Sequence, residues 1–243
     1  MILTAHQPTY LPWLGLFHKI ALADQFCWFN VVQLEHYSFE HRNKIKTAAG
    51  PIWLSVPLLI KDHQAKKASE IRIDNSKNWR QKHWKSIYFN YRKAPYFDQY
   101  AEFFENVYRQ KWDTLHELNG HLLHWFLQTL KIKVRFSQAK QLDLIGSKSD
   151  LVLEMCQKLR ADGFIFGKLG RDYAQPDAFR QAGIMVHFQD YQHPCYNQLY
   201  GKFEPYLSVI DLLFNEGPKS REIIMSGNIT KQELIKELWP IKQ

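Results

Sequence analysis

The first side chains suited to chemistry stand together near the N-terminus. His6 and Gln7 follow the apolar run Ile2–Ala5, and Pro8 and Pro12 keep the next residues out of a helix. An imidazole and an amide thus come at the end of a predicted strand, just before a helix whose free N–H groups favour an anion. The segment predicts a phosphate-binding turn. The alternative is that His6 only hydrogen-bonds a loop shaped by the prolines.

A second candidate loop follows the apolar run Gly163–Gly167. Its glycines permit close backbone approach to a ligand, and its two cations suit an anion. The candidate binding residues are Gly167, Lys168, Gly170, Arg171 and Tyr173, with Asp172 as a candidate acid or base. The loop is not a Walker P-loop, because the Gly-x4-Gly-Lys-Ser/Thr spacing is absent. A turn with solvated charges is the open alternative.

Three more loops combine polar and aromatic side chains. Their candidate residues are Gln33, then Arg42 and Asn43, then His193, Tyr196 and Gln198. Gln33 is expected at the end of a strand next to that of His6. Arg42 and Asn43 could clamp a phosphate or sugar, or form a polar turn before a strand. The third loop is expected either to line a pocket, with His193 as acid or base, or to be structural.

The elements that position these loops follow from hydrophobic periodicity. Apolar runs predict strands, and helical spacing between them predicts βαβ units, whose strands are parallel. Helices are expected over Asn78–Arg92, Phe97–Gln110 and Asp113–Leu130, and a last helix begins at Thr230 with Glu233 in a capping box. We therefore predict one α/β domain over residues 1–243: three layers, a mostly parallel Rossmann-like sheet, and a helical insertion at about 78–130.

Composition limits the possible partners. The 243 residues carry a formal net charge of +8, which favours anionic ligands, but the 32 Lys and Arg form no basic block, so a nucleic-acid arm is not expected. Three dispersed cysteines and the lack of a secretion signal predict a cytoplasmic protein. Peripheral membrane contact through the positive charge stays possible, and the sequence predicts no oligomeric state.

Two motifs are better explained by structure than by ligands. His116 and His121 are five residues apart rather than the four of a zinc-protease helix, so no metal site is predicted there. The segment Trp79–Lys85 mixes aromatic and basic residues as single-strand nucleic-acid platforms do. Its helical period instead places Trp84 on an apolar stripe with Ile87, Tyr88 and Tyr91, which indicates a core helix with a basic outer face.

The segment His6–Ile20 closely resembles the opening signature of the WbqC-like family. The resemblance continues to about Gly217 through Val32-Gln33, Arg42–Ile45, Trp53–Pro57, Trp79, Lys82-His83, Tyr91, Ala94-Pro95, Gly170–Tyr173, Gly183-Ile184, His193-Pro194, Tyr196, Gln198 and Leu207–Asn215. Asn30 departs from the family pattern, where an acidic residue is frequent, and Leu16 stands where a second Phe is usual. The turn at His6 is also similar to the strand–helix turn of nucleotidyltransferase-like folds such as pantoate-amine ligases, without their second His and Gly.

The resemblance implies a role in bacterial surface polysaccharide (O-antigen) biosynthesis, where transfer of an amino acid such as glycine to a sugar has been proposed. The small-molecule partners would be a phosphate-containing donor, such as ATP or a nucleotide-activated compound, and a sugar acceptor. His6 with Lys168 or Arg171 would bind phosphate, Asp172 or His193 would transfer protons, and Tyr10, Trp13 and Tyr196 would stack on sugar or base. The alternatives are a noncatalytic nucleotide-sugar or glycan-binding module and, third, a nucleic-acid-binding protein.

Overall fold

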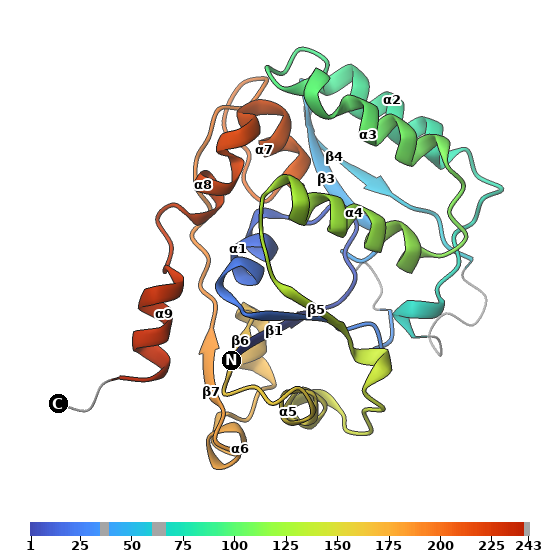
Figure 1. Ribbon diagram of the computed structural model, residues 1–243. Helices are drawn as coiled ribbons and strands as arrows, with labels where there is room; N and C mark the ends of the chain where they lie inside the picture. The colour runs from blue at the N-terminus through green and yellow to red at the C-terminus, as the bar shows by residue number, and fades with distance from the viewer. Residues whose placement is uncertain (35–38, 60–66, 241–243) are drawn as a thin grey trace.

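A five-stranded parallel sheet forms the centre of the protein (Figure 1). The computed structural model describes residues 1–34, 39–59 and 67–240. The strands are β1 (Ile2–His6), β2 (Gln25–Trp28), β5 (Arg135–Gln138), β6 (Gly163–Phe166) and β7 (Met185–Phe188), in the spatial order β5-β2-β1-β6-β7. Counted within this sheet alone, the order is 3-2-1-4-5, which is the Rossmann arrangement. The predicted fold class is confirmed.

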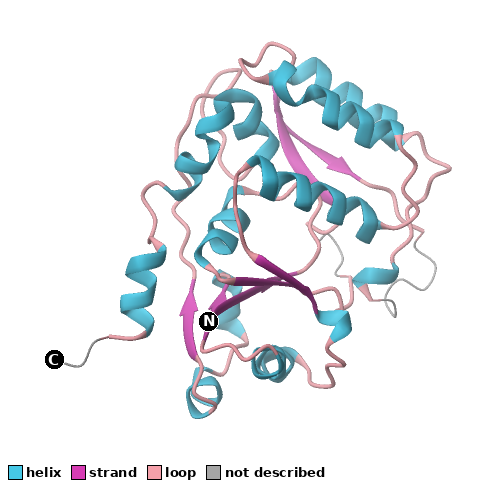
Figure 2. Cartoon of the chain, in the orientation of Figure 1, coloured by secondary structure: helices cyan, strands magenta, loops and turns pink. Residues whose placement is uncertain are grey.

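Helices cover both faces of the sheet and make it the middle of three layers (Figure 2). One face packs on α5 (Lys148–Lys158) and α6 (Pro176–Gln181). The other face packs on α1 (Leu14–Leu22), α4 (Leu115–Thr129) and α9 (Lys231–Leu238). Because successive strand residues point to opposite faces, both sides of the central strands β1 and β6 must be largely apolar. Ile2 and Leu3 of β1, for example, enter different hydrophobic clusters.

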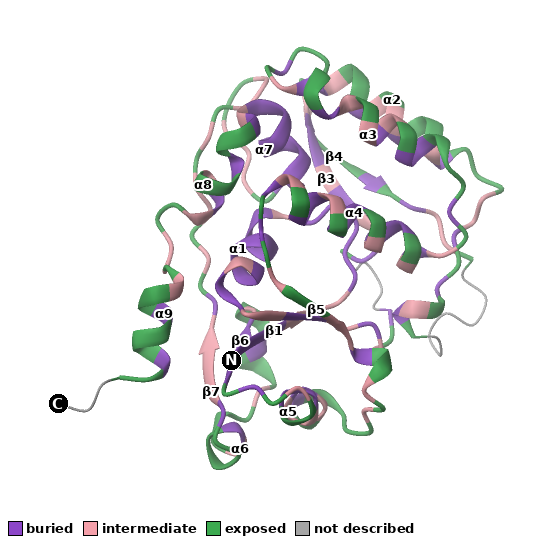
Figure 3. Cartoon of the chain, in the orientation of Figure 1, coloured by how far each residue is buried: buried purple, intermediate pink, exposed green. Residues whose placement is uncertain are grey.

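The middle of the chain is helical, as predicted. After the antiparallel hairpin of β3 (Arg42–Thr47) and β4 (Gly50–Ser55) come a short 3-10 turn, η2 (Ala68–Glu70), and then α2 (Trp79–Tyr91), α3 (Phe97–Arg109) and α4. The later elements are η3 (Ala139–Gln141), η4 (Lys168–Asp172), α7 (Val209–Glu216), η5 (Gly217–Lys219) and α8 (Ser220–Met225). Figure 3 shows α1 and α7 buried along most of their length, so both are core helices.

The buried face of α2 differs from the predicted one. Its buried residues are Trp79, His83, Ile87 and Tyr91, whereas Tyr88 is 39% exposed. A histidine tolerates burial when its polar atoms are satisfied. The Tyr10 hydroxyl lies 2.8 Å from His83 Nδ1 and provides that partner. The capping box of Thr230 and Glu233 at the start of α9 is confirmed.

Arg42 and Asn43 do not form a polar turn before a strand, because they are the first two residues of β3. Asn43 is completely buried, and its Nδ2 donates to the Leu11 carbonyl oxygen at 2.6 Å. A buried amide in a strand is stable when such a partner is present. None of the helices in the described ranges is both long and apolar enough to cross a membrane.

Candidate functional site

The connections from β1 and β6, which are neighbours in the sheet, leave in opposite directions. From β1 the chain moves outward to β2, and from β6 it moves outward to β7. In open α/β sheets, ligands bind outside the carboxyl ends of the strands at such a topological switch point. His6 is the last residue of β1, and Gly167 follows the last residue of β6. Two of the predicted loops therefore lie at the switch point, where a ligand crevice is expected, and we call this place the β1–β6 crevice.

His6 is held in a defined orientation at this edge. Its Nδ1 lies 2.9 Å from the Gln7 carbonyl oxygen and 3.2 Å from Thr9 Oγ1. Because a carbonyl oxygen only accepts, Nδ1 carries the proton and Nε2 is left as an acceptor. Burial, with a smaller effect from Lys19, lowers the pKa of His6 to about 3. The imidazole is therefore neutral at neutral pH, and the described residues give Nε2 no partner.

Lys19 brings a buried amine to the same crevice. The residue is 3% exposed, and its Nζ donates to the Ala5 carbonyl oxygen at 3.0 Å. Burial alone lowers the pKa of Lys19 to about 7, with no carboxylate among the described residues to oppose the shift. A side chain on Gly167 would place its Cβ 3.9 Å from Nζ. The amine therefore lies beneath the Gly167 loop, between the ends of β1 and β6.

Lys19 was not among the predicted site residues, although a signal for it exists. It lies one turn from Leu16 and beside Ile20, on the stripe of α1 that faces the core. Lysine is almost never fully buried unless paired. A lysine at a core position of an apolar helix therefore marks a place where an anion would relieve an unpaired charge.

The loop after β6 forms η4, and most of its predicted ligands point to solvent. A Cβ on Gly170 would lie 2.7 Å from the Phe166 side chain, so this glycine permits the tight turn. The exposed residues of the loop are Lys168, Arg171, Asp172 and Tyr173. The Arg171 guanidinium stacks 5.0 Å from the centroid of the Phe188 ring. Gly167 is thus the member of this loop nearest to the buried amine.

Tyr10 lies in the core rather than on the surface. It is completely buried, and its hydroxyl is 2.5 Å from the Tyr108 hydroxyl as well as bonded to His83. Its ring is closed off from a stacking ligand, so Tyr10 supports the loop instead. Gln7 is half-buried beside His6 and keeps its predicted place at the crevice.

Arg42 and Gln33 have contacts of their own in other segments. Arg42 begins β3, where its guanidinium is 4.4 Å from the centroid of the Trp53 ring. Gln33 is exposed and forms an isolated bridge with Lys67. The structure therefore brings His6 and Gly167 together with Lys19. The part of Arg42 and Gln33 in this site stays a prediction.

His193, Tyr196 and Gln198 belong to a separate polar group around Asp211. Tyr91 and Tyr196 each donate a hydroxyl hydrogen bond of 2.9 Å to the Asp211 carboxylate. Lys46 Nζ donates to Gln198 Oε1 at 2.9 Å, and the His193 ring stacks on Tyr196. Burial raises the pKa of Asp211 to about 6. These contacts connect the segment that precedes α7 to β3 and α2.

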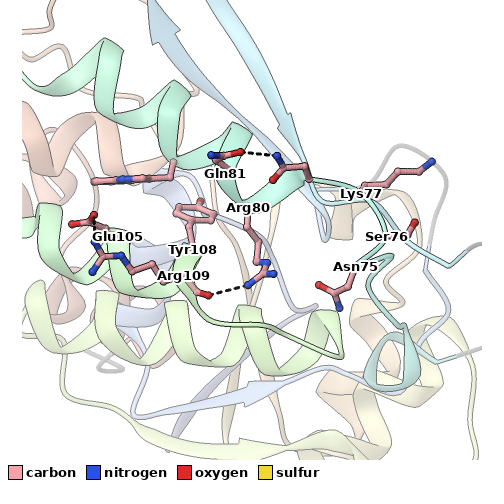
Figure 4. A pocket seen from close by; sticks show the side chains of 10 residues that line it. Asn75, Ser76, Lys77, Arg80, Gln81, Glu105, Tyr108 and Arg109 are labelled. Carbon is pink, nitrogen blue, oxygen red and sulfur yellow. Dashed lines mark hydrogen bonds and ion pairs between the residues drawn. The ribbon is translucent and has the colours of Figure 1, made fainter.

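A polar cleft of about 490 Å³ lies away from the strand ends, between the start of α2 and the end of α3 (Figure 4). Two of the cations that line it have partners: Arg80 donates to the Arg109 carbonyl oxygen at 2.9 Å, and Arg109 forms an ion pair with Glu105. The ranges that the structure describes contain no group of three or more residues suited to hold a metal ion. The crevice at β1 and β6 is thus the better candidate site.

Comparison with known proteins agrees with the extent of the sequence resemblance. Residues 7–223 match the WbqC-like protein family. This chain belongs to the WbqC-like protein family. It is also similar to the uncharacterized protein Rv1507c of Mycobacterium tuberculosis (strain ATCC 25618 / H37Rv), with 32% identity over 220 residues that cover 90% of this chain and 95% of that protein. No solved structure matches. The site of this WbqC-like protein therefore has to be argued from its own geometry.

Proposed function

We propose that this WbqC-like protein is a transferase that binds the phosphate of an activated donor at the β1–β6 crevice and passes a group, such as an aminoacyl group, to a sugar of a bacterial surface polysaccharide. The observation that carries the proposal is the buried Lys19 amine, which no carboxylate pairs among the described residues. An isolated buried cation is costly to maintain, and a bound anion removes that cost.

The position of Lys19 supports a phosphate as the anion. Its Nζ lies near both the end of β1 and Gly167, at the switch point where doubly wound folds bind phosphorylated ligands. Phosphate supplies two negative charges and several acceptor oxygens, which suits an ammonium donor with unused hydrogens. Bound phosphate raises the pKa of Lys19 and keeps the amine charged at neutral pH.

His6 provides the complementary role on the acceptor side. Its Nε2 accepts a hydrogen bond from the attacking group, because Nδ1 is occupied by Gln7. In aminoacyl transfer, the amine of the sugar attacks the acyl carbon; a C–N bond forms, the C–O bond to phosphate breaks, and phosphate leaves with the electron pair. The proton of the amine passes to His6 and then to solvent. The nearby phosphate charge raises the pKa of His6 and makes it a better base.

Asp172 remains a candidate acid or base at the exposed end of η4, and His193 is placed instead with Tyr196. One observation favours the noncatalytic binding module as a second candidate. His6 is oriented by a carbonyl and a hydroxyl, with no carboxylate partner among the described residues, whereas catalytic histidines are commonly oriented by one.

A thermal-shift series tests the binding step. ATP, nucleotide-sugars, nucleoside monophosphates and inorganic phosphate would be compared on the native protein, Lys19→Met and His6→Ala, with the exposed Lys85→Met as matched control. A ligand at 100 times its dissociation constant stabilises the native state by about 2.7 kcal/mol. We expect one phosphate compound to stabilise the native protein and Lys85→Met but not Lys19→Met. Stabilisation that persists in Lys19→Met would refute the proposed site.

Turnover separates the two candidate functions. The stabilising compound would be incubated with amino-sugar acceptors, and release of its phosphate-containing leaving group would be measured. A transferase releases it in the presence of the acceptor, and His6→Ala slows that release by about 10²–10⁴-fold, the range of general-base catalysis. Binding without any release would instead establish the binding module.

A further inference from the structure

A second cleft, of about 730 Å³, opens beside the edge strand β5. It is lined by Trp28, Gly120, His124, Leu127, Gln128, Lys131, Ile132, Lys133, Val134, Phe136 and Gln138. These residues come from the end of β2, from α4, from the segment after α4, and from β5. The segment after α4 leads directly into β5 in Figure 1, and β5 pairs with β2. The volume lies in the range of small-molecule sites.

The cleft begins at the same sheet edge as the β1–β6 crevice. His6 pairs with Trp28 across β1 and β2, and Trp28 pairs with Gln138 across β2 and β5. Adjacent parallel strands lie about 5 Å apart, and paired residues point to the same face. Trp28, a wall of the cleft, is therefore one strand away from His6.

The inner walls of the cleft are apolar. Leu127, Ile132 and Val134 form its aliphatic part, and Phe136 of β5 is 48% exposed. Gly120 is needed for this shape, because a Cβ there would lie 2.8 Å from the Trp28 ring. A half-exposed phenylalanine beside branched aliphatic side chains leaves apolar area that an aliphatic chain would cover.

The charged side chains that line the cleft are basic. Lys131 and Lys133 are exposed, His124 Nε2 lies 3.0 Å from Gln128 Nε2, and none of the lining residues is acidic. An apolar cavity with cations at its border is complementary to a molecule that has an apolar chain and an anionic head.

We propose that this cleft binds an amphipathic anion, with its aliphatic chain against Leu127, Val134 and Phe136 and its phosphate or carboxylate head at Lys131 and Lys133. This second site is lined by none of the residues that form the β1–β6 crevice. Its occupancy therefore does not depend on the function proposed above.

Isothermal titration calorimetry below the micelle concentration tests the proposal with decyl phosphate, decanoate, decanol and decyltrimethylammonium. We expect both anions to bind at one site, and the neutral and cationic compounds to bind at least tenfold more weakly. The two anions distinguish a phosphate from a carboxylate head. Equal affinity for decyl phosphate and decyltrimethylammonium would overturn the proposal, because charge complementarity would then have no effect.

Variants locate the binding. Charge reversal in Lys131→Glu/Lys133→Glu changes only exposed side chains, so the protein should keep its fold, and we expect decyl phosphate affinity to fall at least tenfold. Lys85→Glu is the matched control and should leave it unchanged. Lys19→Met should also bind decyl phosphate normally. Loss of binding in Lys19→Met together with retention in the double variant would place the ligand in the β1–β6 crevice and overturn this inference.

Discussion

Replacing Lys19 with methionine should stabilise the ligand-free protein. The pKa of Lys19 falls from 10.5 to about 7 in the folded chain through burial. At pH 7 this shift corresponds to about 4 kcal/mol of lost folding stability, since one pKa unit is about 1.4 kcal/mol. Methionine has a similar length and carries no charge to desolvate.

The loss of one hydrogen bond reduces this stabilisation of Lys19→Met. Removing Nζ leaves the Ala5 carbonyl oxygen without this donor, which costs about 1 kcal/mol. The net stabilisation is therefore about 3 kcal/mol. For a chain of this length, each kcal/mol raises the melting temperature by about 2–4 °C. The melting temperature of Lys19→Met should rise by about 6–12 °C at pH 7.

The pH dependence identifies the cause. A lysine whose pKa is lowered by folding destabilises the folded state most below that pKa, because the folded protein must then carry the buried charge. The difference in stability between Lys19→Met and the native protein should be largest below pH 7 and should shrink as the pH rises toward 10.5. Calorimetric melting of both proteins from pH 6 to pH 10, with Lys85→Met as control, measures it. A destabilised Lys19→Met, or a difference that does not vary with pH, would refute this reasoning.

Three further predictions concern other parts of the structure. Phosphate affinity should weaken as pH rises above 7, by up to tenfold per pH unit, because free Lys19 loses its proton above its pKa of about 7. Titrations of phosphate binding at pH 6.5, 7.5 and 8.5 measure this change. A constant affinity would argue against a charged amine in the site. Gly120→Val should lower the free energy of unfolding by about 1–3 kcal/mol, because the new Cβ would lie 2.8 Å from the Trp28 ring. Urea unfolding measures this loss. Gly227→Val, at a position with open space but a φ of +66°, shows the effect of backbone strain alone. Folding raises the pKa of Asp211 from 3.8 to about 6. The protonated carboxyl therefore stabilises the folded protein below pH 4, and about 3 kcal/mol of this stability is lost as the pH rises through 6. Asp211→Asn should remove this pH dependence of the free energy of unfolding, and an unchanged dependence would exclude Asp211 as its origin.

Local sequence patterns predicted the elements well, because each depends on neighbouring residues. The continuous apolar runs of the buried strands and the periodicity of α3 and α4 are local signals, as is the capping box at Thr230. The strand ends at His6 and Gly167 followed from them, and parallel strands bring such ends to one edge. The position of these two loops was therefore predictable before their contacts were known.

Features that depend on distant partners were not predictable in this way. Tyr10 looked available for stacking, but its hydroxyl partners His83 and Tyr108 are 73 and 98 residues away in the sequence. Asn43 was expected either to bind a phosphate or sugar or to lie in a polar turn, yet its buried amide donates to the Leu11 carbonyl oxygen, 32 residues away. Lys19 was hidden by its apolar neighbours in α1, and only the fold shows that its amine reaches the end of β1.

The proton balance of phosphate binding shows whether the Lys19 amine holds the phosphate. Calorimetric titration at pH 8, in two buffers of different ionisation enthalpy, gives the number of protons taken up when the phosphate compound binds. Because free Lys19 is mostly neutral at that pH and the bound phosphate holds it charged, we expect uptake of close to one proton by the native protein and by Lys85→Met. Binding to Lys19→Met with unchanged affinity and the same proton uptake would contradict it.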